Sequence, residues 1–380
     1  MNFQLSEQHR LVRDMARDFA AGEIAPHAEE MDRTHAFPTE ILEKAKGLGL
    51  LGIVVPEEYG GAGMDFLSYI IILEEIGRVC ASTCVILSVH NTLFIGGLLK
   101  FGSEEQKRAW LPRAASGEIL GAYLLTEPGA GSDAGSLKLR AKKVEGGWRL
   151  TGSKSFITNG GVASHGIVYG RTDPEAGTRG ISAFLFDMDA EGVTRGAEEK
   201  KMGLNASSTV QVTFEDVFVP EENLLGEENR GFPVAMEILN AGRIGIAAQA
   251  LGIAQAALDE SVAYSGQREQ FGTTINRFQS IQWFLSEMAT EIEAARLLIY
   301  RAAVAYGEGR RVIKEAAMAK LFASAACMRA VDKAVQIHGG YGYTRDYKVE
   351  RLFRDAKVTE IYEGTSEVQR IVIARALAAS

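Results

Sequence analysis

The segment IYEGTSEVQR, residues 361–370, places an acidic side chain, Glu363, directly after an isoleucine and a tyrosine and directly before a glycine. Ser366 and Gln369 are spaced as in a capping box, and an apolar stripe at helical spacing follows them. The pattern predicts that Glu363 lies in a loop just before a helix, where the helix dipole favours a negative charge. Two roles stay open for this residue: a surface acid at a helix start, or a carboxylate that takes part in chemistry.

Two glycine-containing segments could let a flat polar ring approach the backbone. LLTEPGAGSDAG, residues 124–135, combines two closely spaced glycines with the hydroxyls of Thr126 and Ser132. SFITNGG, residues 155–161, adds Phe156, which could cover an aromatic face. The glycine spacing is one residue too long for GxGxxG and no alternating β and α units surround it, so a Rossmann site is not supported. A plain Pro/Gly turn between strands is the alternative.

The remaining motifs indicate no metal or P-loop chemistry. QIHGGYGY, residues 336–343, follows a helical pattern and is typical of a helix C-terminal turn. The chain has neither GxxxxGK[ST] nor HExxH. Cys80, Cys84 and Cys327 fit neither a disulfide framework nor a paired zinc site. We therefore predict three core thiols and no metal site.

The hydrophobic patterns divide the chain into three zones. Residues 1–118 show apolar positions at helical spacing and a capping box at Ser103 and Gln106, and they predict an N-terminal helical domain. Residues 119–228 contain short β-rich runs separated by Gly, Asn and Asp, and they predict a middle β domain. Residues 229–380 return to long apolar helical patterns that suit a C-terminal bundle.

Composition and charge exclude several function classes. The chain has 380 residues, of which 46% are hydrophobic and 24% charged, as in soluble proteins of two or three domains. A net charge of -8 argues against a nucleic-acid binder. The most apolar run, residues 83–99, contains His90 and Asn91 and is shorter than the ~20 residues of a spanning helix, so it predicts a buried helix and no membrane insertion. The N-terminus lacks the pattern of a signal peptide, which favours a cytoplasmic location.

Seven segments stand in the same order and spacing as in the acyl-CoA dehydrogenases, which the chain resembles over essentially its whole length. They are PEEYGGAGMD (56–65), LLTEPGAGSD (124–133), FITNG (156–160), GRIGIAAQALGIAQAALDE (242–260), REQFG (268–272), QIHGGYGY (336–343) and IYEGTSEVQR (361–370). Among the subfamilies, the chain most resembles the short-chain, butyryl-CoA type. The resemblance implies an α+β, mainly α fold: an N-terminal helical domain, a middle β-barrel-like or β-sandwich domain, and a C-terminal four-helix bundle.

The resemblance also implies a reaction, the α,β-dehydrogenation of an acyl-CoA thioester to the trans-2-enoyl-CoA with FAD as acceptor. Glu363 would abstract the α-proton while the β-hydrogen leaves as hydride to the flavin N5. Ile361, Tyr362 and the apolar substrate would desolvate the carboxylate and raise its pKa toward the operating pH. Gly364 would leave room for the ligand, and the Glu363 amide with a flavin hydroxyl would stabilise charge on the thioester oxygen.

A helix of the C-terminal zone is expected to complete the substrate site. Some family members have the base at the position of Gly242, which has no side chain to act as one. Arg243 matches an arginine that helps to hold the acyl-CoA site and the carboxylate, with a surface ion pair as its alternative role. Asn240 stands where the family often has aspartate. The residues assigned to the substrate are Ser132, Asn240, Arg243, Tyr362 and Gly364.

The resemblance assigns FAD contacts to three parts of the chain. The isoalloxazine side comprises Tyr123, Leu124, Leu125, Thr126, Gly131, Ser132, Phe156, Ile157 and Thr158. The pyrophosphate and adenine, partly across a subunit boundary, are assigned to Arg268, Phe271, Gln279, Gln336, Gly339 and Gly340. The start of the last helix adds Thr365, Ser366 and Glu367, where free helix amides suit an anion. A shared cofactor implies an obligate oligomer, and the family norm predicts a homotetramer built as a dimer of dimers.

Other functions remain possible from the sequence alone. Dehydrogenases of short branched acyl-CoAs, of the isobutyryl or 2-methylbutyryl type, use the same chemistry with a differently packed pocket. An acyl-CoA oxidase would use the same base and flavin but pass electrons to oxygen, and such enzymes are usually much longer. A non-catalytic helical scaffold would explain the bundle but not Glu363, Arg243 and the flavin segments together. The expected electron acceptor is an electron-transferring flavoprotein, in fatty-acid β-oxidation or amino-acid breakdown.

Overall fold

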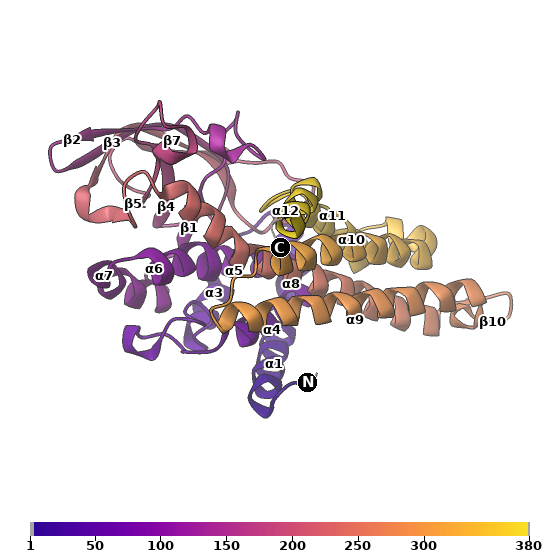
Figure 1. Ribbon diagram of the computed structural model, residues 1–380. Helices are drawn as coiled ribbons and strands as arrows, with labels where there is room; N and C mark the ends of the chain where they lie inside the picture. Colours follow the sequence, from indigo (N-terminus) through magenta and orange to yellow (C-terminus); the bar gives the residue numbers. More distant parts are fainter. Residues whose placement is uncertain (1–3, 379–380) are drawn as a thin grey trace.

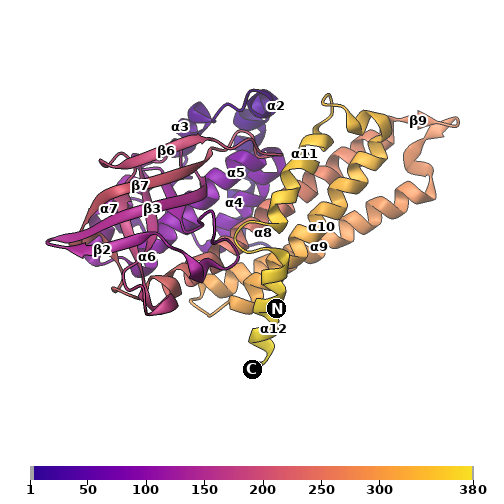
Figure 2. The same cartoon turned by 90° about the horizontal axis from the view of Figure 1, so that it is seen from above.

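The computed structural model describes residues 4–378, in which helices come first, a sheet follows, and long helices end the chain. The sheet lies at one end of an elongated molecule (Figures 1 and 2). Long helices α8 (Gly231–Gln267), α9 (Gln279–Gly307) and α10 (Ile313–His338) run toward the other end. The first three residues of the N-terminal zone and the last two of the C-terminal zone lie outside the described range.

Seven α-helices form the first part of the described chain. They are α1 (Glu7–Phe19), α2 (Ala25–Thr34), α3 (Thr39–Gly47), α4 (Phe66–Val79), α5 (Ala81–Ser88), α6 (Gly96–Phe101) and α7 (Glu104–Ala115). The capping box at Ser103 and Gln106 is confirmed, since both of its hydrogen bonds are present. Helix α4 is buried along most of its length because it packs against α8.

The most apolar run of the chain forms a continuous helical stretch, Ala81–Phe101, made of α5, a π-helical turn (Val89–Ile95) and α6. By length and composition it could cross a membrane, but 78% of its most hydropathic window is buried inside the protein. That burial is the property of a core helix, and the prediction of a buried helix is confirmed.

The middle of the chain folds into an eight-stranded sheet. Its strands are β1 (Gly121–Leu124), β2 (Arg140–Val144), β3 (Gly147–Thr158), β4 (His165–Arg171), β5 (Ile181–Asp187), β6 (Val193–Glu198), β7 (Thr209–Pro220) and β8 (Leu224–Leu225). They follow the order β6-β7-β3-β2-β4-β5-β8, and β1 pairs with β4 in parallel.

The sheet curls around a core of its own. The rings of Trp148 and Phe184 have centroids 5.1 Å apart, as do those of Phe186 and Phe214. These pairs join β5 to β3 and to β7, which are not its neighbours in the sheet. The curled sheet and the flanking helices confirm the predicted fold class.

The last part of the described chain is a helical bundle. Helices α8, α9 and α10 pack against one another, and α11 (Lys348–Ala356) and α12 (Ser366–Ala378) lie against α10. A short hairpin, β9 (Glu269–Gln270) and β10 (Thr273–Thr274), joins α8 to α9 at the tip. The predicted domain boundaries fall between α7 and β1 and between β8 and α8.

Candidate active site

Glu363 lies in the turn before α12, and its carboxyl group packs over Gly242 of α8. A Cβ atom at position 242 would lie 2.1 Å from Oε2 of Glu363 and 2.8 Å from its Cδ. Nothing larger than hydrogen fits there without moving the carboxyl group. The glycine that cannot act as a base therefore makes the space that Glu363 occupies.

The backbone at Glu363 has an uncommon conformation. Glu363 has φ +52° and Gly364 has φ +96°, both in the left-handed region. A non-glycine residue there costs of order 1–3 kcal/mol, so the surrounding structure must impose it. Three side chains bond the two carbonyls: Arg243 Nε donates to Glu363 O (3.4 Å), and Lys320 Nζ and Gln369 Nε2 each donate to Gly364 O (2.8 Å).

The predicted capping box at the start of α12 is wrong. The Ser366 hydroxyl has no hydrogen-bond partner, and the Val368 amide donates instead to Thr365 Oγ1 at 3.3 Å. Gln369 has the right spacing for the box, but its amide group turns back to the carbonyls of Glu363 and Gly364. The residue that looks like a cap partner in the sequence fixes the turn of the acid.

The Glu363 carboxyl group is buried without a hydrogen-bonding partner. The residue as a whole is half-buried, but Oε2 is fully enclosed and bonds to nothing within residues 4–378. Removal from water raises the pKa of Glu363 to about 8, although the charges of Arg243 and Lys320 act in the opposite direction. A carboxyl group whose pKa lies near the operating pH is suited to accept a proton as a general base.

Arg243 is buried on α8 beside Glu363. Its Nη1 donates to Oδ1 of Asn240 at 2.9 Å, and Asn240 Nδ2 donates to Glu237 at 3.2 Å. Within residues 4–378 it forms no ion pair within 4.0 Å, so a surface ion pair does not explain it. Burial lowers the pKa of Arg243, and the negative charge of Glu363 partly offsets this.

The face of α8 that continues from Gly242 is closed by polar and apolar side chains. One turn along, a Cβ at Gly245 would lie 2.8 Å from Ser88 Oγ and 3.2 Å from Tyr69 Oη. One turn further, Gln249 accepts a hydrogen bond from the Tyr362 hydroxyl and donates to Ala81 O at 2.7 Å. The space next to the carboxyl group is therefore shallow on this side.

The two predicted ring-binding segments lie together. The Ser155 amide donates to Thr126 O at 2.9 Å, which joins the loop after β1 to the end of β3. Phe156 has φ +56° and a side chain that is 66% exposed. The Tyr123 hydroxyl donates to Ala235 O of α8 at 3.3 Å, which ties this edge of the sheet to the bundle.

The features of this edge fit a flavin ring. Added side-chain atoms at Gly129 and Gly131 would meet nothing within 4 Å, so the backbone there is open to a ligand. At the start of α12, Ser366 Oγ and Gln369 Oε1 are buried and have no hydrogen-bond partner in the described part of the chain. An exposed aromatic face, open backbone and unpaired polar atoms are what a flat, hydrogen-bonding ring system requires.

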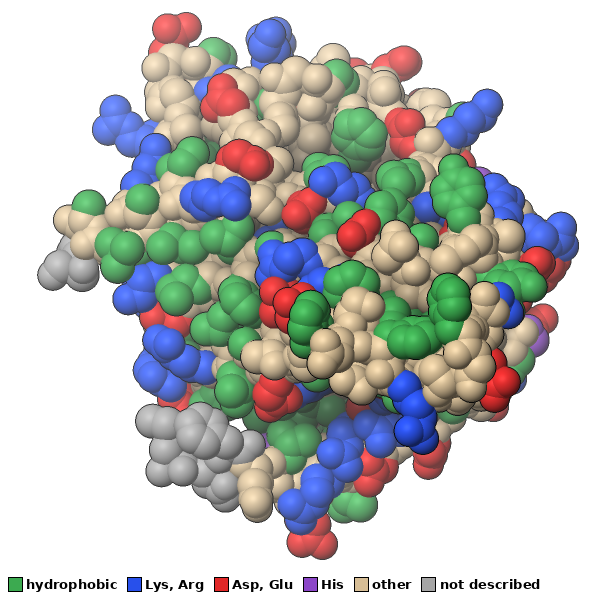
Figure 3. Space-filling model, turned by 90° about the vertical axis from the view of Figure 1, so that its right-hand side faces the viewer, with side chains coloured by type: hydrophobic (Ala, Val, Ile, Leu, Met, Phe, Trp, Pro, Cys, Tyr) green, Lys and Arg blue, Asp and Glu red, His purple; other side chains and the backbone are tan. Residues whose placement is uncertain are grey.

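The second group of predicted cofactor residues lies at the far end of the bundle. A hollow of 530 Å³ is lined by Arg268, Gly339, Gly340, Tyr341 and their neighbours. Phe271 on the adjoining hairpin is 95% exposed, and Gln279 and Gln336 are also exposed. Figure 3 looks onto the side of the molecule where this end lies and shows hydrophobic side chains among Lys and Arg.

The structure does not bring the two groups of cofactor residues together within one chain. Arg243 on α8 and Arg268, the residue directly after α8, are 25 positions apart along the chain. At 1.5 Å per residue this corresponds to roughly 37 Å, more than one extended dinucleotide can span. The first group adjoins Glu363 and the second does not.

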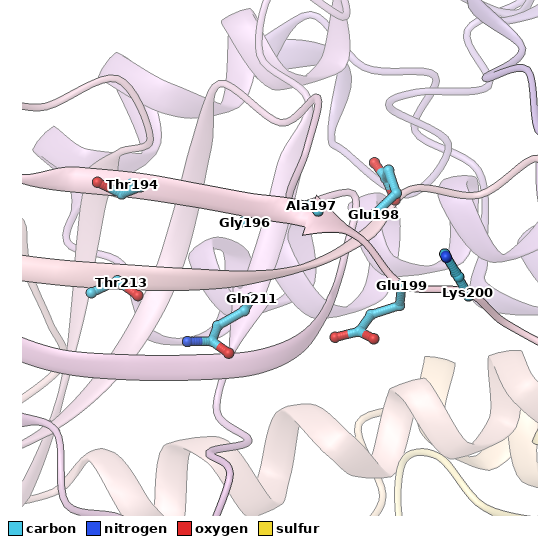
Figure 4. Close-up of a pocket in the computed structure, with 8 residues that line it drawn as sticks. All are labelled: Thr194, Gly196, Ala197, Glu198, Glu199, Lys200, Gln211 and Thr213. Carbon is cyan, nitrogen blue, oxygen red and sulfur yellow. The ribbon is translucent and has the colours of Figure 1, made fainter.

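A separate groove on the middle domain has no predicted site residue. It measures 550 Å³ and is lined by Thr194, Gly196, Ala197, Glu198, Glu199, Lys200, Gln211 and Thr213. Figure 4 shows these residues along β6, the two positions after it and β7, with no aromatic residue among them. Residues 4–378 contain no group of three or more His, Cys, Asp or Glu that could hold a metal ion.

Sequence reasoning missed Lys320, Gln249 and Tyr69. Each lies within a regular helical pattern, where a polar residue gives no sign that it faces a site. For Lys320 the sequence does contain one indication of its role. A lysine flanked by Ala319 and Leu321 on an apolar helix indicates a buried cation that needs a partner.

Comparison with known proteins gives a consistent result along the chain. Family models match residues 6–118 (acyl-CoA dehydrogenase, N-terminal domain), 122–217 (middle domain) and 229–378 (C-terminal domain). The "Acyl-CoA dehydrogenase, short-chain specific" of Clostridium acetobutylicum is 49% identical over 373 residues, which cover 98% of each chain.

Two solved structures superpose on the whole chain. Butyryl-CoA dehydrogenase from Megasphaera elsdenii has a TM-score of 0.98 at 45% identity. A chain from a structure of the electron transferring flavoprotein of Acidaminococcus fermentans has a TM-score of 0.99 at 48% identity. Both matches cover 100% of this chain and of the other.

Proposed function

The chain belongs to the acyl-CoA dehydrogenase family, and we propose that it converts short-chain acyl-CoA thioesters to trans-2-enoyl-CoA with Glu363 as the base. The observation on which this rests is the unpaired carboxyl group of Glu363, enclosed over Gly242 with a raised pKa. A carboxyl group held in this way is needed to remove a weakly acidic α-proton.

The groups around Glu363 supply the other parts of proton abstraction. Oε2 takes the α-proton, and the cations of Arg243 and Lys320 favour the ionised carboxylate beforehand. The Glu363 amide N–H forms no hydrogen bond within residues 4–378, so it is free to donate to the thioester oxygen as charge develops there. The left-handed turn at Glu363 and Gly364 fixes the direction of both groups.

FAD supplies the redox chemistry, since when bound it accepts the hydride from the substrate β-carbon. The loop after β1 with Thr126 and Ser132, the segment at Phe156 and Thr158, and the start of α12 would hold its ring. These segments present the open backbone and unpaired polar atoms described above.

The packing beside the Glu363 carboxyl group and the similarity to known enzymes both support a short acyl chain. Ser88, Tyr69 and the Gln249–Tyr362 pair fill the space along α8 beside the carboxyl group. A long chain would have to displace these groups and break the bond of Gln249 to Ala81. The similarity to a short-chain specific enzyme and to a butyryl-CoA dehydrogenase points the same way.

The electrons leave the enzyme on an electron-transferring flavoprotein. We also propose a homotetramer in the cytoplasm, in which the Arg268 end of one subunit meets the cofactor held at the Glu363 end of another. The distance between the two groups along α8 supports a cofactor site shared between chains.

The test is anaerobic bleaching of the flavin, followed in the visible spectrum while purified protein is titrated with acyl-CoAs from four to sixteen carbons. The panel includes branched four- and five-carbon thioesters. Bleaching that is fastest with butyryl-CoA is the expected result. Faster bleaching by a branched or longer thioester would keep the chemistry and overturn the substrate, and a protein without flavin would overturn both.

A further inference from the structure

Lys320 lies on α10 in the middle of the bundle and is fully buried. Its ammonium group has one acceptor within residues 4–378, the carbonyl of Gly364 at 2.8 Å, and no carboxylate within 4.0 Å. A buried ammonium offers three donors and costs several kcal/mol to desolvate, so a single neutral acceptor leaves it under-satisfied. Such an arrangement needs a reason beyond the stability of the helix.

The catalytic turn does not require Lys320 for its shape. Gln369 Nε2 also bonds Gly364 O at 2.8 Å and reaches Glu363 O at 3.3 Å, and Arg243 bonds Glu363 O. The left-handed turn would therefore keep its other donors without the lysine. Lys320 is the residue of α10 that places a positive charge next to the turn at Glu363 and Gly364.

Charged groups face Lys320 from several elements. Glu363 in the turn, Glu360 before it and Glu367 on α12 favour its protonated form, whereas Arg243 on α8 opposes it. Arg243 and Lys320 in turn favour the ionised form of Glu363, and the negative charge of Glu363 raises the pKa of Tyr69 and of Tyr123. The lysine and the carboxylate are each unfavourable alone and are mutually stabilising.

We propose that Lys320 is a positioning residue of the reaction: from α10, where it donates to the Gly364 carbonyl, it supplies the counter-charge that favours the ionised form of Glu363 before substrate binds. This inference rests on the proposed role of Glu363 as the base. Burial lowers the pKa of Lys320 to about 8, whereas the negative charge of Glu363 raises it; the positive charge of Lys320 in turn lowers the pKa of Glu363.

The test is the pH dependence of flavin reduction in single turnover with excess butyryl-CoA, which does not depend on the electron acceptor. The rate of flavin reduction should rise with pH as Glu363 ionises. In Lys320→Met the loss of an opposite charge should shift this rising limb of the pH–rate profile to higher pH by about one unit and lower the rate at pH 7 roughly tenfold. At high pH the rates of variant and wild type should converge, and the half-saturating butyryl-CoA concentration should stay within about threefold.

Lys320→Arg keeps the positive charge, so its rate of flavin reduction should rise at the same pH as that of the wild type. Lys348→Met is the control, because Lys348 also donates to a main-chain carbonyl, Arg78 O at 3.0 Å, but lies on α11 and pairs with Glu260 at 3.7 Å instead of facing Glu363. It should leave the limb unmoved. If Lys320→Met does not retain flavin, Lys320→Gln, which keeps one donor without the charge, should show the same upward shift.

An unmoved limb in a folded, flavin-containing Lys320→Met or Lys320→Gln would overturn the proposal. So would a shift of equal size in Lys348→Met. A wild-type protein that butyryl-CoA and the other thioesters fail to bleach would instead overturn the proposed function, so the two failures are distinguishable.

Discussion

Two buried lysines of this protein, Lys154 in the middle domain and Lys320 in the bundle, meet carboxylates in different ways. Lys154 is fully buried and forms a direct ion pair with Glu127 at 2.8 Å. The same carboxylate also accepts the amides of Lys138 at 2.6 Å and Leu139 at 2.9 Å. Lys320 bonds a carbonyl instead, and the carboxylate that it faces, Glu363, keeps an unpaired oxygen.

The difference shows how the same residue types serve structure in one place and chemistry in another. The carboxylate of Glu127 is fully bonded, because its oxygens accept hydrogen bonds from a lysine and two main-chain amides. Glu363 is charged only at a cost, so a proton bound to Oε2 is stabilised. The unpaired atom, and not burial in itself, marks the reactive site.

The largest expected effect comes from removing the base. Glu363→Gln keeps the shape of the side chain but cannot accept a proton, so flavin reduction by butyryl-CoA should slow by roughly 10²–10⁴-fold. The visible spectrum of the purified variant should still show bound flavin, because the amide disturbs none of the cofactor segments. Reduction at the wild-type rate would show that Glu363 is not the base.

Lys154→Met should act on folding. It leaves Glu127 buried without its cation, and breaking a buried pair in this way costs about 3–5 kcal/mol of unfolding free energy. Urea denaturation followed by circular dichroism measures the loss. A change below about 1 kcal/mol would remove the contrast with Lys320, because the Lys154–Glu127 pair would then not be structural.

Gly242→Ala should damage catalysis more than folding. The added methyl group would lie 2.1 Å from Oε2 of Glu363 and must displace the carboxyl group, and a shift of this kind costs of order 10²-fold in rate. Gly266→Ala is the control on the same helix, since its nearest neighbour is Asn276 Nδ2 at 3.8 Å. Equal flavin reduction rates in the two variants would contradict the packing of Glu363 over Gly242.

The smallest and most graded effect is that of pH on the wild type. Below a pKa of about 8 the Glu363 carboxyl group is increasingly protonated and cannot accept the α-proton. The rate of flavin reduction should therefore rise about tenfold per pH unit between pH 6 and 7 and level off above pH 8 to 9. A rate that is constant from pH 6 to 9 would contradict the raised pKa of Glu363.

Much of the fold follows from local patterns. Helical periodicity, strand-like runs and the capping box at Ser103 and Gln106 depend on neighbours in the chain, and each was predicted correctly. The Ser366 and Gln369 spacing obeys the same local rule, yet tertiary bonds to Glu363 and Gly364 override it. A capping pattern in the sequence indicates which hydrogen bonds can form locally, but tertiary contacts decide which partner each side chain bonds.

The sequence by itself determined the three-part order of the chain, the apolar burial of residues 83–99 and the position of Glu363 in a loop just before the last helix. These follow from residue type and spacing, which short-range sterics and hydrophobic burial translate directly into structure. Only the tertiary structure decided that Gly242 makes space for the carboxyl group and that Lys320, 43 residues before Glu363 in the chain, stands behind it. The physical reason is that desolvation and charge depend on which distant helices meet at one point, and no local pattern records that meeting.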